Sequence, residues 1–171
     1  MRWFMLLVAL LVVSTACAQQ VPDAPLVGSP LAGSWKMAEI AVISARGENR
    51  YPAPAPGLFV FGESHYSMVW MPLTEVPPDF AEIWKPTEEE KAAAFSSIVV
   101  NSGTYTYTDT TVTTTPTVAK TPEFIGGYAV YAYRVEGDTL WMDMTDTVSR
   151  DGVQDPGVGL FRMPLKLVRV E

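Results

Sequence analysis

The sequence is poor in the residues that build disulfides, metal centres and nucleophilic triads. Its 171 residues include one cysteine, Cys17, and one histidine, His65. A lone cysteine cannot form an intramolecular disulfide, so burial alone must stabilise the core. A lone histidine beside a turn gives little support to a zinc site or to a Ser-His-Asp or Cys-His constellation. We expect neither a metal nor a cofactor, and we assign no catalytic residue.

Basic residues are also scarce. Lysine and arginine total 12 against 19 aspartates and glutamates, and the net charge is -7 at pH 7. The basic residues are scattered singly and form no patch along the chain. Nucleic acids and anionic membrane surfaces are therefore disfavoured as partners.

A long apolar run occurs only at the amino terminus, in "MRWFMLLVALLVVSTACAQQ". One basic residue, Arg2, precedes an uninterrupted apolar stretch over residues 3–13. That stretch is about half of the roughly 20 residues that span a bilayer, so we predict a secretory signal instead of a lasting transmembrane helix. The protein is then extracytoplasmic, either periplasmic or secreted.

Two processing routes remain open for this leader. Small residues around Cys17 suit ordinary cleavage after Ala18, which would remove residues 1–18. Residues 14–17 also resemble a bacterial lipobox, although Ser14 stands where leucine is usual. In that case residues 1–16 are removed, Cys17 is lipidated, and the protein is tethered to a membrane as a lipoprotein.

The remainder divides into a Pro-rich linker, residues 19–30, and one domain, residues 31–171. From residue 33 the domain shows short alternating segments separated by turns, which is typical of an all-β sandwich or barrel. "ARGENR", at 45–50, is interpreted as a turn. Pro116 should mark a strand end or a bulge. About eight antiparallel strands are expected, the number that closes an up-and-down barrel around one small ligand; they lie near 33–44, 57–62, 65–71, 103–109, 110–118, 128–135, 139–144 and 159–170.

One segment favours a helix. Thr87 and Glu90 form the spacing of a capping box. Phe95, Ile98 and Val99 would fall on one helical stripe. We predict one short helix at about 87–100, between the third and fourth strands, lying across one mouth of the barrel as a lid.

The whole domain resembles the lipocalins, and in particular the bacterial lipocalin-like domain proteins. Gly33-x-Trp35 on the first strand is similar to the lipocalin opening signature. Further pieces of the pattern are Tyr51-Pro52 before "GLFVF", "TEEEKAAAF", "NSGTYTY" at 101–107 and "YRVEGDTLWM" at 133–142.

The resemblance implies a role in folding for the first-strand tryptophan. In lipocalins this side chain lies across the closed end of the barrel, and a basic side chain from the last strand stacks over it. Arg169 is our choice for that partner, with Lys166 second, while Gly33 lets the backbone turn in. Gly33, Trp35 and Arg169 are thus assigned to barrel closure.

Strand alternation predicts which side chains enter the barrel, because successive residues point to opposite faces. The resulting rows would suit a small apolar or amphipathic ligand with one polar end. Alternatively they fill the barrel as core. The candidate lumen residues are Phe59, Phe61, Tyr66, Met68, Trp70, Tyr105, Tyr107, Tyr131 and Tyr133.

Three functions are therefore weighed. The first is an exported lipocalin-like protein that binds or carries a small apolar or amphipathic molecule. The second is a non-catalytic envelope structural or interaction domain with a filled barrel and apolar loops around Phe80 and Trp84. The third is a lipid-modifying isomerase or hydrolase, for which Asp143 and Asp146 are the only paired carboxylates considered, and turn capping is the plainer interpretation of both. Ligand identity and oligomeric state are left open.

Overall fold

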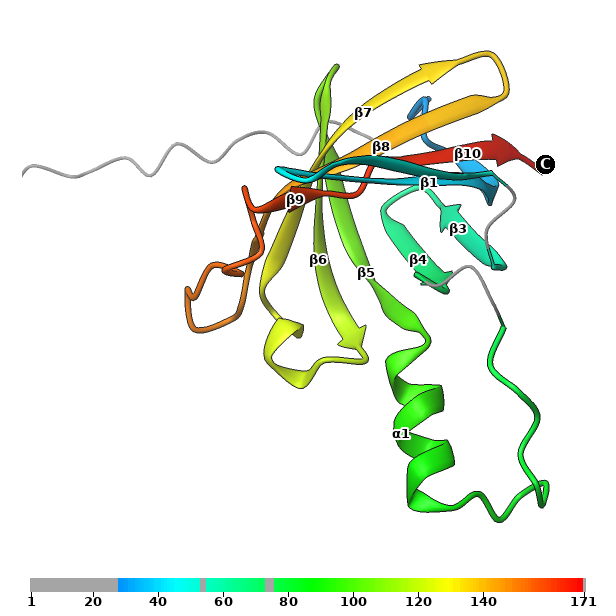
Figure 1. The fold of residues 1–171 in the computed structure, drawn as a ribbon. Helices are drawn as coiled ribbons and strands as arrows, with labels where there is room; N and C mark the ends of the chain where they lie inside the picture. Colours follow the sequence, from blue (N-terminus) through cyan, green and yellow to red (C-terminus); the bar gives the residue numbers. More distant parts are fainter. Residues whose placement is uncertain (1–27, 53–54, 73–75, 171) are drawn as a thin grey trace, which may run out of the picture.

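The computed structural model describes residues 28–52, 55–72 and 76–170, which form an all-β fold with one α-helix (Figure 1). The predicted leader, Cys17 and most of the predicted linker lie outside the described residues. Elements in chain order are β1 (Gly33–Ser44), β2 (Gly47–Pro52), β3 (Gly57–Phe61), β4 (His65–Trp70), α1 (Glu88–Ser96), β5 (Val99–Tyr107), β6 (Thr111–Ala119), the 3₁₀ helix η1 (Pro122–Phe124), β7 (Tyr128–Glu136), β8 (Thr139–Val148), β9 (Phe161–Arg162) and β10 (Leu165–Arg169).

Eight of these strands close an antiparallel barrel. The hydrogen-bonded order runs β10-β8-β7-β6-β5-β4-β3-β1, and β1 pairs in turn with β10. Apart from β2 and β9, strands that are neighbours in the barrel follow one another in the chain, so the topology is up-and-down. The predicted eight-stranded barrel is confirmed.

The predicted position of the helix relative to the strands is wrong. Residues 47–52, most of which we interpreted as a turn, form β2, which pairs with the second half of β1 from Glu39↔Pro52 to Ser44↔Gly47. The helix α1 therefore follows the fourth strand and lies between β4 and β5. All six residues of β2 are exposed, so the strand shows no apolar alternation in the sequence. Backbone hydrogen bonds pair it with β1, and Nη1 of Arg50 also donates to Glu39 on β1 at 2.7 Å.

The helix itself begins where predicted and ends early. The Thr87 hydroxyl accepts from the backbone of Glu90, whose carboxylate accepts in return from the backbone of Thr87 at 2.7 Å. That carboxylate also accepts from the Ala81 amide, and these bonds lower the pKa of Glu90. The helix ends at Ser96, however, and no residue of α1 is buried. The predicted apolar stripe is therefore wrong, because Phe95 is 57% exposed and the chain has already turned into β5 by Val99.

One end of the barrel is closed by Trp35. The indole is fully buried, and its Nε1 donates to the carbonyl of Leu31 at 2.7 Å. The guanidinium of Arg169 lies 4.0 Å above the indole ring, and its Nη1 donates to the carbonyl of Ala32 at 2.7 Å. Trp35 and Arg169 are directly opposed in the β1–β10 pair, whereas Lys166 stands opposite Glu39. Arg169 is thus the basic residue that stacks on the tryptophan.

The chain before β1 is packed into this same end. Leu31 is fully buried, and Ser29, within the segment assigned to the linker, is also buried. Gly33 has a φ of +124°, in the left-handed region that favours glycine. The backbone can therefore turn sharply from the buried segment that contains Ser29 and Leu31 into β1.

Aromatic side chains fill the half of the barrel next to Trp35. The ring of Tyr105 meets that of Phe61 edge-on, with centroids 5.3 Å apart. The Tyr105 hydroxyl donates to the carbonyl of Gly62 at 2.9 Å, and the Tyr133 hydroxyl donates to that of Thr108 at 2.8 Å. Both phenols thereby satisfy backbone groups at turns of the closed end.

We predict that Arg169→Ala lowers the free energy of unfolding by about 2 kcal/mol, because it removes a partly buried cation–π contact and a hydrogen bond together. Arg134→Ala is the matched control. Its guanidinium lies 4.1 Å from the Trp141 ring, but its side chain is 59% exposed, so its loss should be under about 1 kcal/mol. Urea denaturation measures both, and equal losses would contradict the special role of Arg169.

Candidate functional site

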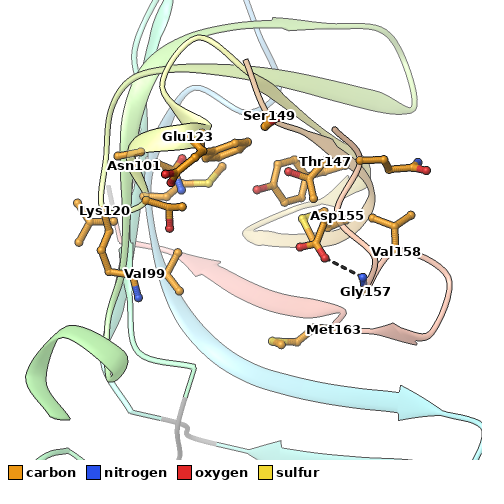
Figure 2. Close-up of a pocket in the computed structure, with 18 of the residues that line it drawn as sticks. Val99, Asn101, Lys120, Glu123, Thr147, Ser149, Asp155, Gly157, Val158 and Met163 are labelled. Atoms are coloured by element: carbon orange, nitrogen blue, oxygen red, sulfur yellow. Dashed lines mark hydrogen bonds between the residues drawn. The ribbon is translucent and has the colours of Figure 1, made fainter. Parts of the chain in front are cut away.

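The open half of the barrel holds a cavity of about 650 Å³. Tight turns join the strands at the closed end, whereas the connections β4–β5, β6–β7 and β8–β10 at the opposite end are long (Figure 1). Strand residues form the walls of the cavity, and residues from the connections around 120–124 and 149–158 form its rim (Figure 2). Its volume is within the range of small-molecule sites.

The walls are mainly apolar. Among the nine candidate lumen residues, the cavity is lined by Phe59, Met68, Trp70 and Tyr131. Methionine and leucine side chains from β8, β10 and the segment before β10 add flexible apolar surface; these are Met144, Met163 and Leu165. Such a wall accepts an apolar molecule without a strict shape.

The other five candidates lie away from this cavity. Phe61, Tyr66 and Tyr105 are buried in the filled half next to Trp35. Tyr107 and Tyr133 line a smaller hollow of about 400 Å³ with Pro30 at the closed end. The inward rows therefore run the whole length of the barrel, while the larger space is enclosed only near the open mouth. Whether any of the nine binds a ligand stays a prediction.

Two bulges place residues in the wall that simple alternation misses. In β8, Met144 faces Tyr131 and Asp146 faces Val130, so Thr145 is an extra residue and the inward side switches to Thr147. After a bulge, the residues that would have faced outward face inward. Nothing in the sequence of β8 predicts this bulge.

The second bulge lies in β6 next to Pro116, as predicted. Pro116 is opposite Gly103 and Val118 is opposite Ser102, so Thr117 is extra and Ala119 turns inward. A Cβ on Gly103 would lie 2.1 Å from the carbonyl oxygen of Thr115, so the close approach of the two strands requires glycine.

Among the described residues few polar groups reach the interior, and the charged residues that line the cavity lie at its rim. Asn101 lines the cavity, is only 5% exposed, and its Oδ1 has no hydrogen-bond partner among the described residues. Tyr66 lies deeper, and its hydroxyl likewise has no partner there. Burial raises the pKa of Tyr66, and burial raises the pKa of Tyr131, which is half-buried and lines the cavity, to about 12. Both phenols are therefore neutral at physiological pH.

The rim, by contrast, is acidic. Carboxylates come from both long connections that border it: Glu123, Asp151 and Asp155. Among the described lining residues the one cation is Lys120, whose Nζ donates to the carbonyl of Phe95 at 3.0 Å and lies 4.7 Å from that ring. Negative charge thus dominates the entrance.

The residues considered for catalysis do not form a common site. His65 is exposed, with Nδ1 2.8 Å from the Ser64 hydroxyl. Asp143 is paired with Arg162, and Asp146 accepts from Gln154 at 2.7 Å. Within the part of the chain that the structure describes, no three His, Cys, Asp or Glu side chains are grouped to hold a metal ion. No helix in that part is long and apolar enough to cross a membrane.

The predicted lid does not cover the cavity. No residue of α1 lines it, and neither does any described residue of the β4–β5 connection. The first lining residues after that connection are Val99 and Val100, at the start of β5. Figure 1 shows α1 extending beyond the ends of β4 and β5. The rim is instead built by η1 with its flanks and by the segment after β8.

The comparison with known families agrees with this architecture. Residues 32–155 match the lipocalin-like domain family, a span from the residue before β1 to the rim segment after β8. The chain belongs to the lipocalin-like domain family. No curated protein matches it. The matched part of this lipocalin-like domain contains most of the cavity wall, including Asn101 and Tyr131.

Tyr131 should make stability depend on alkaline pH. An unfolded tyrosine ionises near about 10, whereas the folded phenol keeps its proton to about 12. Between these values the unfolded state binds fewer protons, so the free energy of unfolding falls as pH rises, by about 1 kcal/mol per pH unit for one group. Urea denaturation across this range should show a shallower fall for Tyr131→Phe than for the wild type. Parallel curves would contradict the raised pKa.

Proposed function

We propose that this lipocalin-like protein binds a small apolar or amphipathic molecule in the open half of its barrel. The cavity of about 650 Å³ carries the proposal, because its lining offers apolar strand residues around a few neutral polar groups. Transfer of apolar surface from water into such a space is favourable by about 25 cal/mol per Å². Carriage or sequestration follows from binding without any chemical step.

The space inside the barrel favours binding over a purely structural role. A filled barrel is expected for an interaction domain, and here only the half next to Trp35 is packed. Trp84, in the β4–β5 connection, is 88% exposed, which is the apolar loop that the interaction alternative expects. An interaction role for this loop does not explain the cavity, whereas ligand binding does.

The proposed place of action is outside the cytoplasm. Its support is the apolar run over residues 3–13 behind Arg2, together with small residues at the cleavage position. The acidic net charge of -7 is compatible with release into the periplasm or medium, or with a tether through Cys17.

Filling the cavity should weaken ligand binding. Ala119 lines the wall, so Ala119→Trp places an indole in the space that a ligand would occupy. We expect the fluorescent apolar probe N-phenyl-1-naphthylamine to bind the wild type and to bind this variant at least about tenfold more weakly. Fluorescence titration measures both affinities.

The matched control is Val118→Trp. Val118 is the neighbouring residue, is 60% exposed and is absent from the lining of the cavity, so probe affinity should stay within about twofold of the wild type. Equal binding by all three proteins would move the site away from the cavity, and a wild type that refuses the probe would remove the proposal.

Processing at the amino terminus is tested by metabolic labelling with a palmitate analogue in the native host. If the lipobox is used, the wild type takes up label and Cys17→Ala does not. Ordinary cleavage after Ala18 leaves both proteins unlabelled and released from the cell membrane. Label retained by Cys17→Ala would contradict lipidation at that residue.

A further inference from the structure

We propose that the cavity selects an apolar molecule with an uncharged hydrogen-bond acceptor, such as a ketone or an ester, and that Nδ2 of Asn101 donates to this acceptor. This inference deepens the proposed function and rests on it. Three observations carry it: an amide of which only the donor end is open to the cavity, apolar or neutral walls around that amide, and an acidic rim.

Asn101 is the first observation. It lies on the inward face of β5, opposite Met68 on β4 and Ala119 on β6, whose side chains contain no oxygen or nitrogen. The side chain lines the cavity (Figure 2), although the residue is only 5% exposed. Its Oδ1 is closed off, so Nδ2 is the atom of the amide that a bound molecule reaches. An amide nitrogen only donates hydrogen bonds, and the bound molecule must therefore supply the acceptor.

The second observation concerns the surroundings of this donor. Within the described lining, the walls contribute apolar side chains such as Phe59 and Trp70, together with the neutral phenol of Tyr131. In surroundings of this kind a hydrogen bond is stronger than in water, and a donor without an acceptor is unfavourable. A carbonyl oxygen beside Nδ2 satisfies the amide while the rest of the molecule contacts the apolar wall.

The rim restricts the charge of the acceptor. A carboxylate also accepts hydrogen bonds, but on its way in it passes Glu123, Asp151 and Asp155, whose negative charges repel it. The one cation of the described lining, Lys120, already donates from its Nζ to the carbonyl of Phe95. A quaternary ammonium is attracted to the rim but has no lone pair with which to accept. An uncharged carbonyl avoids the repulsion and still accepts from the amide.

The experiment measures how well molecules of one chain length displace N-phenyl-1-naphthylamine from the cavity. Octan-2-one and 2-methyloct-1-ene have nearly the same shape, because a methylene group in the alkene takes the place of the carbonyl oxygen. The ratio of their half-displacement concentrations is compared between the wild type and Asn101→Leu, which retains apolar bulk without the amide. Comparing ratios cancels the difference in hydrophobicity between the two molecules, since that difference is the same for both proteins. We expect the ratio to shift against the ketone by about fivefold in Asn101→Leu.

Ser102→Ala is the matched control. Ser102 is adjacent to Asn101, and its hydroxyl donates to Ser67, away from the cavity lining, so the ratio should equal that of the wild type. If Asn101→Leu does not fold, Asn101→Ala removes the same amide without adding bulk and should shift the ratio in the same direction.

Octanoate and octyltrimethylammonium test the charge of the head group. On the wild type near neutral pH, both should displace half of the probe only at concentrations at least about fivefold higher than octan-2-one.

The outcomes separate the two proposals. A wild type that binds no probe overturns ligand binding in the cavity, and this inference with it. Probe binding with the same ketone-to-alkene ratio in the wild type and in the Asn101 variant overturns only the role of Asn101. Displacement by octanoate or octyltrimethylammonium at concentrations as low as those of octan-2-one overturns the selectivity for an uncharged acceptor.

Discussion

The pairing of the first strand with the last, locked by Trp35 and Arg169, is the contact on which the rest of the structure depends. It closes the sheet on itself, and the same two side chains seal one end of the barrel over Leu31. Because this end is sealed, the barrel opens at the opposite end, and a ligand must enter there. The long connections at that mouth then determine the shape and charge of the entrance.

The interior is divided by how its polar groups are satisfied. Near the sealed end, the hydroxyls of Tyr105 and Tyr133 donate to turn carbonyls, which holds bulky rings in fixed positions and fills the space. Toward the mouth, bulges bring the small side chains of Ala119 and Thr147 inward, and space remains. The same barrel therefore provides a rigid packed half and a hollow half.

How far the fold could be predicted depends on the range of the interactions involved. The capping box at Thr87 and Glu90 is a local pattern, so the sequence predicted where α1 begins. β2 was not predicted because its six residues are all exposed, so its pairing with β1 produces no apolar alternation in the sequence. Because this strand was missed, the helix was predicted after the third strand, whereas it follows the fourth. The end of α1 was missed for a related reason, since Val99 is required by the pairing of β5 with β4.

The sequence by itself determined the strand-rich fold, the count of barrel strands and the inward rows of aromatic side chains, because alternation with a period of two is written residue by residue. It also determined the acidic balance and the scarcity of histidine and cysteine. Only the tertiary structure decided that the space is open near Trp70 and filled near Tyr105. Those features follow from bulges and strand register, which arise between segments distant in the chain and leave little trace in either segment alone.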